Sequence, residues 1–324
     1  MNSLTYGAIG IALLAASAVA FEYLFPSVAA RGWTGLARAA GRLTRRTVRA
    51  GAHTVPYLEG GRGEPLVLVH GFGADKDNFA GIAPFLTPHV RLLAPDLPGF
   101  GEATRDPRSS YQIADQVRLL HAFIEALALG PVHLGGSSMG GFVVAEFAAT
   151  YPDLVKSLWL IDAAGVAECA DTSMLRHYRA SGEIPLLVRD KSAFALLLRA
   201  VMRRPAFLPP SLYSTLACRA VADLKLHTRI FREIAIESPT LESRLDSITA
   251  PTLIVWGDQD EVLSPTAAAA FGRGISGSEV IVMPGVGHLP HLERPRATAR
   301  DYLRFRTRIG CSRRAASAVT SLPA

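Results

Sequence analysis

The feature that most constrains the fold of this chain is an alternation of short apolar runs with amphipathic segments, which starts near residue 52. Continuous apolar runs of this length are typical of strands that are buried on both faces of a parallel sheet. The amphipathic segments between them have the spacing of crossover helices. We therefore expect an α/β fold with a mostly parallel sheet flanked by helices. The runs cover residues 65–70, 90–95, 131–135, 157–161, 251–256 and 279–283.

The alternation stops over residues 165–248, where no β-type run occurs and apolar residues recur at helical spacing. Because this stretch lies between two strands, we expect an inserted helical cap above the carboxyl ends of the strands, where open α/β sheets bind their ligands. The core is then predicted at 52–164 and 249–306, with a last helix from Pro295 to Phe305. Residues 307–324 are predicted to be a frayed tail.

The N-terminus resembles a membrane segment. Residues 4–21 are 18 mostly apolar positions without a charge, and as a helix they would span about 27 Å of a bilayer core that is about 30 Å thick. The sequence predicts a single transmembrane anchor over residues 1–30. The arginines that follow it favour a cytoplasmic location for the chain from residue 31 onward. A cleaved signal peptide with export of the remainder is the alternative, because residues 16–18 and 18–20 have the A-x-A pattern.

The positive charge of the chain is concentrated at its two ends. The net charge is +6, yet six arginines and no acidic residue lie within 31–49, and residues 50–306 sum to −2. This distribution disfavours a nucleic-acid-binding core. On a helical wheel the arginines oppose an apolar stripe, so 31–51 is predicted to be a basic amphipathic juxtamembrane segment on an anionic membrane, with a solvated linker as the alternative. The stripe consists of Trp33, Leu36, Ala40, Leu43 and Thr47.

The strongest chemical motif is Gly-Ser-Ser-Met-Gly at residues 136–140, directly after an apolar run and before a helical pattern. A G-x-S-x-G turn between a strand and a helix exposes the central serine as a nucleophile, and its glycines allow strand and helix to approach. We therefore expect Ser138 to be the nucleophile. The N–H of the next residue, Met139, is expected to form half of an oxyanion hole.

A serine nucleophile needs a base, and His288 lies in a glycine-rich turn directly after the last apolar run. His291 is the nearest competitor, but its place at a helix start favours capping or packing. His70, His121 and His133 end or lie within regular elements, where a packed histidine is the default.

The imidazole needs a carboxylate to hold its tautomer. Asp260 follows the fifth run, and the chain order serine, aspartate, histidine is the one this architecture uses. Asp258 in the same turn is more typical of a residue that stabilises its own loop. Asp162, after the fourth run, is a topologically possible substitute acid. The second oxyanion donor is expected from Phe72, within His-Gly-Phe-Gly at residues 70–73.

Taken together, residues 52–306 resemble the α/β-hydrolase superfamily, and the apolar and basic N-terminus looks like its membrane-anchored monoacylglycerol lipase and esterase branch. The matching motifs are HGFG at 70–73, DLPGFG at 96–101, GSSMGG at 136–141, WGDQDEV at 256–262 and GHLPHLERP at 287–295.

The resemblance implies an α/β-hydrolase fold with Ser138, His288 and Asp260 as the triad and Phe72 and Met139 as oxyanion donors. It implies no metal and no organic cofactor, and the three scattered cysteines form neither a disulfide framework nor a zinc site. The expected substrate is a small lipid or ester. Other hydrolase chemistry, such as carbon–carbon cleavage or acyl transfer, and a non-catalytic ligand-binding protein remain alternatives.

Overall fold

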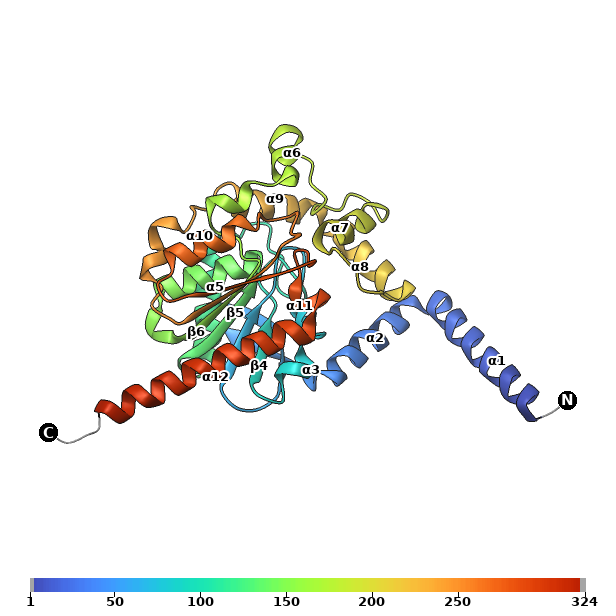
Figure 1. Ribbon diagram of the computed structural model, residues 1–324. Helices are drawn as coiled ribbons and strands as arrows, with labels where there is room; N and C mark the ends of the chain where they lie inside the picture. The colour runs from blue at the N-terminus through green and yellow to red at the C-terminus, as the bar shows by residue number, and fades with distance from the viewer. Residues whose placement is uncertain (1–2, 321–324) are drawn as a thin grey trace.

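The computed structural model describes residues 3–320 (Figure 1). Its eight-stranded sheet has the order β1-β2-β4-β3-β5-β6-β7-β8. Strand β2 is antiparallel to β1 and β4, and the other neighbours are parallel. The mostly parallel sheet and all six predicted strands are thus confirmed. The strands are β1 (Leu43–Ala50), β2 (His53–Gly60), β3 (Pro65–Val69), β4 (Arg91–Pro95), β5 (Val132–Ser137), β6 (Val155–Ile161), β7 (Thr252–Gly257) and β8 (Glu279–Met283).

Successive side chains of a strand point to opposite faces of the sheet. Both faces are apolar here, and helices cover both of them. Val67 and Val69 of β3 belong to one buried apolar cluster, and Leu66 and Leu68 belong to the other. The first cluster includes side chains of α4 (Ile113–Ala126), α5 (Met139–Thr150) and α10 (Thr266–Gly274), and the second includes those of α3 (Ala83–Leu86) and α12 (Pro295–Thr320).

The sheet begins earlier than the sequence indicated. Residues 43–50, expected to continue a basic amphipathic helix, form β1, which pairs with β2 through the two-residue turn Gly51–Ala52. Gly51 has a φ of +58°, a conformation that suits glycine in a tight hairpin. Arg45 and Arg46 form ion pairs with Glu102 and Glu59. The helical prediction for this stretch is wrong, because pairing with β2 outweighs the local apolar periodicity.

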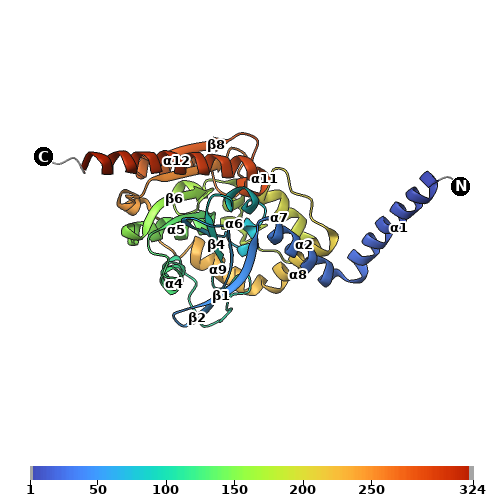
Figure 2. The same cartoon turned by 90° about the horizontal axis from the view of Figure 1, so that it is seen from below.

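The residues before the sheet form two helices, α1 (Ser3–Leu24) and α2 (Pro26–Ala40), and α1 projects away from the rest of the molecule (Figure 1, Figure 2). Within residues 3–320, no helix combines the length and the apolar character that crossing a bilayer requires. The described residues therefore do not support the predicted anchor over 1–30. Glu22 near the end of α1 accepts hydrogen bonds from Trp33 Nε1 at 2.5 Å and from Ser211 N at 3.0 Å. This end of α1 is thus held against the cap.

The segment between β6 and β7 is helical, as predicted, and lies at one end of the sheet (Figure 1). Its helices are α6 (Ser173–Ser181), α7 (Ala193–Val201), α8 (Pro210–Ala222) and α9 (Leu224–Ala235), and it also contains the short 3₁₀ helices η3 (Ala167–Ala170) and η4 (Glu242–Ser247). The short helices elsewhere in the described chain are η1 (Lys76–Phe79), η2 (Pro152–Leu154) and α11 (Pro290–Glu293). The three cysteines are free.

The predicted tail is also corrected. Helix α12 does not end at Phe305 but continues to Thr320, and residues 321–324 lie outside the described residues. Ion pairs from Arg306 to Glu64 and from Arg308 to Glu279 hold this helix on the sheet beyond the predicted end. Periodicity alone did not reveal them, because both acids are distant in sequence.

Candidate active site

Ser138 lies in a strained turn between β5 and α5, with φ 56° and ψ −122°. Its N–H donates to Ile161 O at 3.0 Å. A Cβ on Gly136 would lie 2.2 Å from Gly140 O, and a Cβ on Gly140 would lie 2.1 Å from Val69 O. Only glycine therefore fits these positions, and the strand–turn–helix context expected for a nucleophilic serine is present.

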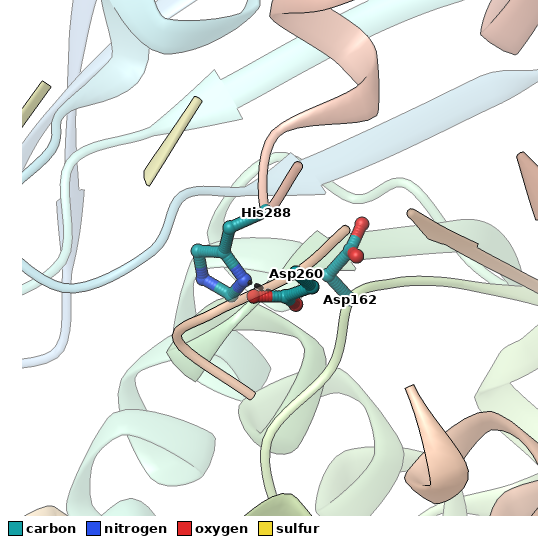
Figure 3. A group of neighbouring side chains, drawn as sticks. All are labelled: Asp162, Asp260 and His288. Atoms are coloured by element: carbon teal, nitrogen blue, oxygen red, sulfur yellow. Dashed lines mark hydrogen bonds and ion pairs between the residues drawn. The ribbon is translucent and has the colours of Figure 1, made fainter. Parts of the chain in front are cut away.

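His288 and Asp260 meet above the ends of β7 and β8. Nδ1 of His288 is 2.7 Å from Oδ2 of Asp260, and both side chains are almost fully buried (Figure 3). The other oxygen of Asp260 accepts hydrogen bonds from the N–H groups of Val262 at 2.8 Å and Leu263 at 3.0 Å. Three nitrogen atoms thus hold the carboxylate in place, and the carboxylate orients the imidazole so that Nε2 is the free basic nitrogen.

The two competing residues have structural positions. Asp258 Oδ1 accepts a hydrogen bond from Gly285 N at 2.7 Å, which ties together the loops after β7 and β8. His291 is fully buried, with Nε2 2.6 Å from Oδ1 of Asn78. Burial and, secondarily, the charge of His288 lower the pKa of His291 to about 3. His291 is therefore a neutral donor that links the loop of His288 to the segment that follows Gly73.

Asp162 is the third acidic candidate and is fully buried at the end of β6, with φ 43°. Its Oδ1 accepts a hydrogen bond from Gly257 N at 2.9 Å. In Figure 3 its carboxyl group points away from the imidazole, whereas that of Asp260 points toward it. Burial first and the charge of Asp260 second raise the pKa of Asp162 well above its ordinary value. A raised pKa favours the protonated, neutral form of the carboxyl group, which is a poor partner for an imidazolium ion.

These three side chains are also the one cluster, within the described part of the chain, whose donor atoms are close enough to share a metal ion, all within 4.8 Å. The nitrogen of His288 that faces the cluster is already bonded to Asp260, and one oxygen of Asp162 is bonded to Gly257 N. Two of the three side chains thus use a donor atom in internal hydrogen bonds with each other, and Oδ2 of Asp162 is buried without a hydrogen-bond partner among the described residues.

The loop predicted to supply the second oxyanion donor lies beside the nucleophile. A Cβ on Gly71 would be 3.1 Å from Cβ of Ser138 and 3.7 Å from its Oγ. The ring of Phe72 packs edge-on against Phe100 and against Phe231 of cap helix α9. Met139 is the first residue of α5, where an N–H has no acceptor inside its own helix.

His70 holds this loop rather than reaching into the site. Its Nδ1 is 2.8 Å from Gly71 O, and its Nε2 accepts a hydrogen bond from Leu97 N at 3.1 Å. Burial lowers the pKa of this fully buried histidine, which is the expected state of a neutral ring that donates from Nδ1 and accepts at Nε2.

One buried pair near the site was not singled out as functional in the sequence. Nζ of Lys76 lies 2.8 Å from Oδ2 of Asp96, and both side chains are almost fully buried. Asp96 also accepts from the backbone N–H groups of Lys76 and Glu102. The sequence signal was weak, because a lysine flanked by two aspartates is usually solvent-exposed. The pair joins the segment after Gly73 to the loop after β4.

The cap has an open hollow between α6 and α7, beside the loop that carries Asp260. Its lining surface is mostly apolar and includes Met174, Pro185 and Leu196, together with Arg199 and with Glu261, the neighbour of Asp260.

Comparison with known proteins places this geometry in a family. Residues 66–301 match the family described as "Alpha/beta hydrolase family". The chain is 37% identical to "Lipase 3" of Moraxella sp. (strain TA144), over 75% of this chain and 78% of that protein. It is 32% identical to mouse "Monoacylglycerol lipase ABHD6", over 75% of this chain and 77% of that one.

Among solved structures, a bacterial membrane phospholipase A described as a virulence factor superposes with a TM-score of 0.86 at 35% identity, covering 94% of this chain and 99% of that chain. The match therefore includes residues outside the sheet and its flanking helices. Together with the strand–turn–helix geometry at Ser138 and the family match over most of the chain, this structural similarity shows that the protein belongs to the α/β-hydrolase family.

Proposed function

We propose that this enzyme hydrolyses carboxylic esters of lipids, with monoacylglycerols as the leading class, through an acyl-enzyme on Ser138. The observation that carries the proposal is the buried hydrogen bond between His288 Nδ1 and Asp260, in loops at the same sheet edge as the Ser138 turn. The relatives named lipase, monoacylglycerol lipase and membrane phospholipase A support the substrate class.

In the proposed mechanism, Nε2 of His288 accepts the proton of Ser138 as its Oγ attacks the ester carbonyl carbon. The resulting oxyanion accepts hydrogen bonds from the N–H groups of Phe72 and Met139. His288 then donates its proton to the departing alcohol, which leaves the acyl group on Ser138. A water molecule, deprotonated by His288, attacks the carbonyl carbon of the acyl-enzyme; His288 then returns this proton to Oγ of Ser138 as the bond to the acyl group breaks and the fatty acid leaves. Asp260 stabilises the imidazolium ion in both halves of the reaction.

The experiment that tests this function compares the intact protein with its Ser138→Ala variant on one panel of substrates. The panel contains a monoacylglycerol, a diacyl phospholipid, a short-chain aryl ester and a vinylogous 2-hydroxy-6-oxo-dienoate. We expect fatty acid release from monoacylglycerol at least 100-fold above the variant, and labelling of Ser138 by a fluorophosphonate.

The other outcomes separate the alternative functions. Cleavage of the dienoate alone would identify a carbon–carbon hydrolase, and ester formation only on addition of an acceptor alcohol would identify an acyltransferase. A protein that is neither labelled nor active on any substrate would be a ligand-binding member of the family.

We further propose that the enzyme acts at a membrane surface. Large apolar side chains are exposed near the junction of α1 and α2 and on the cap loop before α8, where Phe207 is 85% exposed. The bond between Glu22 and Ser211 N brings these two regions together. Exposed Arg203 and Arg204 lie on the same cap loop and complement an anionic lipid surface.

Replacing Phe207 with serine is expected to weaken partitioning onto anionic vesicles about tenfold, because burial of an aromatic side chain contributes about 1.5–3 kcal/mol. Val282→Ser is the matched control, since Val282 is 48% exposed but lies on β8 at the far edge of the sheet. Vesicle sedimentation with the intact chain measures both variants. Equal partitioning of the two variants would show that the loop of Phe207 does not contact the lipid.

A further inference from the structure

The segment that follows the loop of Phe72 is held by residues outside the hydrolase core. After Gly73 the chain turns into η1, and Asp75 caps this turn by accepting a hydrogen bond from Asp77 N at 2.9 Å. We call residues 70–79 the oxyanion segment. It contains Gly71 beside Ser138 and the N–H group of Phe72, so any displacement of the segment moves an oxyanion donor.

Helix α2, near the N-terminus, binds the oxyanion segment near its end. Arg38 binds Asp77 through two parallel hydrogen bonds, Nε to Oδ1 at 2.6 Å and Nη2 to Oδ2 at 2.7 Å. Only 21% of the arginine side chain and 22% of the aspartate side chain are exposed. A planar two-point contact of this kind restricts orientation as well as distance, which a single charge contact does not.

The cap binds Asp75, which lies two positions before Asp77. Nη1 of Arg219, on α8, lies 2.8 Å from Oδ2 of Asp75. Helix α8 also packs against α2, and both lie on the same side of the molecule (Figure 2). Two arginines, one from each helix, therefore bind two aspartates that are separated by one residue.

The remaining contacts of the oxyanion segment lead back to the core. Lys76 pairs with Asp96 in the loop after β4, and Asn78 bonds to His291 in the loop that also carries His288. The oxyanion segment is thus bound to the loop that carries His288 and also to helices α2 and α8. Among these contacts, the one with α2 is made by a residue, Arg38, that lies before residues 66–301, the range that matches the family.

We propose that Arg38 is a positioning residue for catalysis: through Asp77 it holds the oxyanion segment at the distance from Ser138 that the tetrahedral intermediate requires. This inference rests on the proposed function, in which Phe72 donates to the oxyanion. It assigns α2 to the catalytic scaffold. The sequence had placed Arg38 on the basic face of a juxtamembrane helix, opposite its apolar stripe, where it would have acted only on membrane binding.

The two roles of Arg38 differ in what they change. A membrane contact affects activity on lipid aggregates and leaves a dissolved ester unaffected. A positioning residue affects the transition state of every ester, because the oxyanion forms only after the substrate has bound. The kinetic signature is therefore a lower kcat with an unchanged KM on a dissolved short-chain ester.

The experiment uses the full chain with a short-chain aryl ester below its aggregation concentration. Arg38→Ala is expected to lower kcat about tenfold with KM within about twofold, since small misplacements of catalytic groups can cost up to about 100-fold. Affinity for a trifluoromethyl ketone, whose adduct with Ser138 carries an oxyanion, is expected to fall by the same factor as kcat/KM. Arg38→Lys keeps the charge without the two-point contact and is expected to lie between.

Arg31→Ala is the matched control, because it removes the same charge from an exposed position of the same helix. It is expected to retain the kcat of the unaltered enzyme. Asp77→Ala and the double variant with Arg38→Ala complete a cycle in which the double variant is expected to be no slower than either single variant. Thermal unfolding confirms that each variant is folded at the assay temperature.

Three results would overturn the positioning role: an unchanged kcat in folded Arg38→Ala, an equal loss in Arg31→Ala, or a double variant whose losses multiply. Failure of the proposed function would look different. In that case the unaltered enzyme and Ser138→Ala would hydrolyse the aryl ester at the same rate, before Arg38 is considered.

Discussion

Replacing Asp260 with asparagine is expected to lower kcat on any ester about 10⁴-fold, because the amide stabilises the wrong imidazole tautomer and carries no charge. The substitution preserves shape, and the hydrogen bonds from Val262 N and Leu263 N can still be accepted by the amide oxygen. The fold is therefore expected to survive. Steady-state kinetics, with the unfolding midpoint measured on the same samples, separates lost chemistry from lost structure.

Asp162→Asn is the matched control for that prediction. Asp162 is also buried, and its carboxylate lies within 4.8 Å of the donor atoms of Asp260 and His288, but its raised pKa favours the neutral form. Its conversion to an amide is expected to leave kcat within about tenfold of the unaltered enzyme, since an amide resembles the neutral carboxyl group in shape and charge. If Asp162→Asn were the slower variant, the acid of the triad would be Asp162.

The same control has a distinct effect on stability. A carboxyl group whose pKa is raised by folding stabilises the folded state fully below its unfolded pKa of about 4, and this contribution is lost progressively as the pH rises from there to the folded pKa. At pH 7 the buried Asp162 is therefore less favourable than a neutral amide. Asp162→Asn is expected to raise the free energy of unfolding at pH 7, with the gain fading toward pH 4, as measured by urea denaturation.

The buried pair of Lys76 and Asp96 is expected to give the largest loss of stability. Lys76→Met leaves the Asp96 carboxylate buried with only backbone donors, and removal of one member of a buried pair costs about 3–5 kcal/mol. Denaturant unfolding of the full chain measures this loss. The double variant Lys76→Met with Asp96→Asn is expected to recover part of it, since no uncompensated charge remains.

Lys156→Met supplies the comparison for that loss. Lys156 lies the same 2.8 Å from the carboxylate of Glu64, but this pair is exposed, with 30% and 52% of the two side chains accessible. An exposed pair contributes about 0–1 kcal/mol, so the variant is expected to unfold close to the unaltered protein. A similar small effect of Lys76→Met would mean that Asp96 is not left as an isolated buried charge.

The core of the fold could be predicted because its signals are local. Six apolar runs marked six strands, and the glycines around Ser138 marked the turn, since strand burial and tight turns depend on residues close in sequence. The strands at residues 43–50 and 53–60 were missed for the opposite reason. Leu43 and Thr47 fit an apolar helix stripe, and only the pairing of 43–50 with 53–60 makes these segments strands.

The candidate site was predicted in the same partial way. The positions of Ser138 and His288 followed from their turns, but the choice between Asp260 and Asp162 depended on which loop meets the imidazole. Two residues of the oxyanion segment, Asp75 and Asp77, had no signal of their own. Their partners lie 144 and 39 residues away, on a cap helix and an N-terminal helix.

The sequence by itself therefore determined the alternation of strands and helices, the nucleophile turn and the order of the candidate triad, because short-range steric and apolar patterns encode them. The tertiary structure alone decided which carboxylate faces His288, which arginines bind the oxyanion segment and where the N-terminal helices lie. These features depend on contacts between distant segments, which no local pattern specifies. Arg38 illustrates the difference: its charge is evident in the sequence, but its partner is determined by the fold.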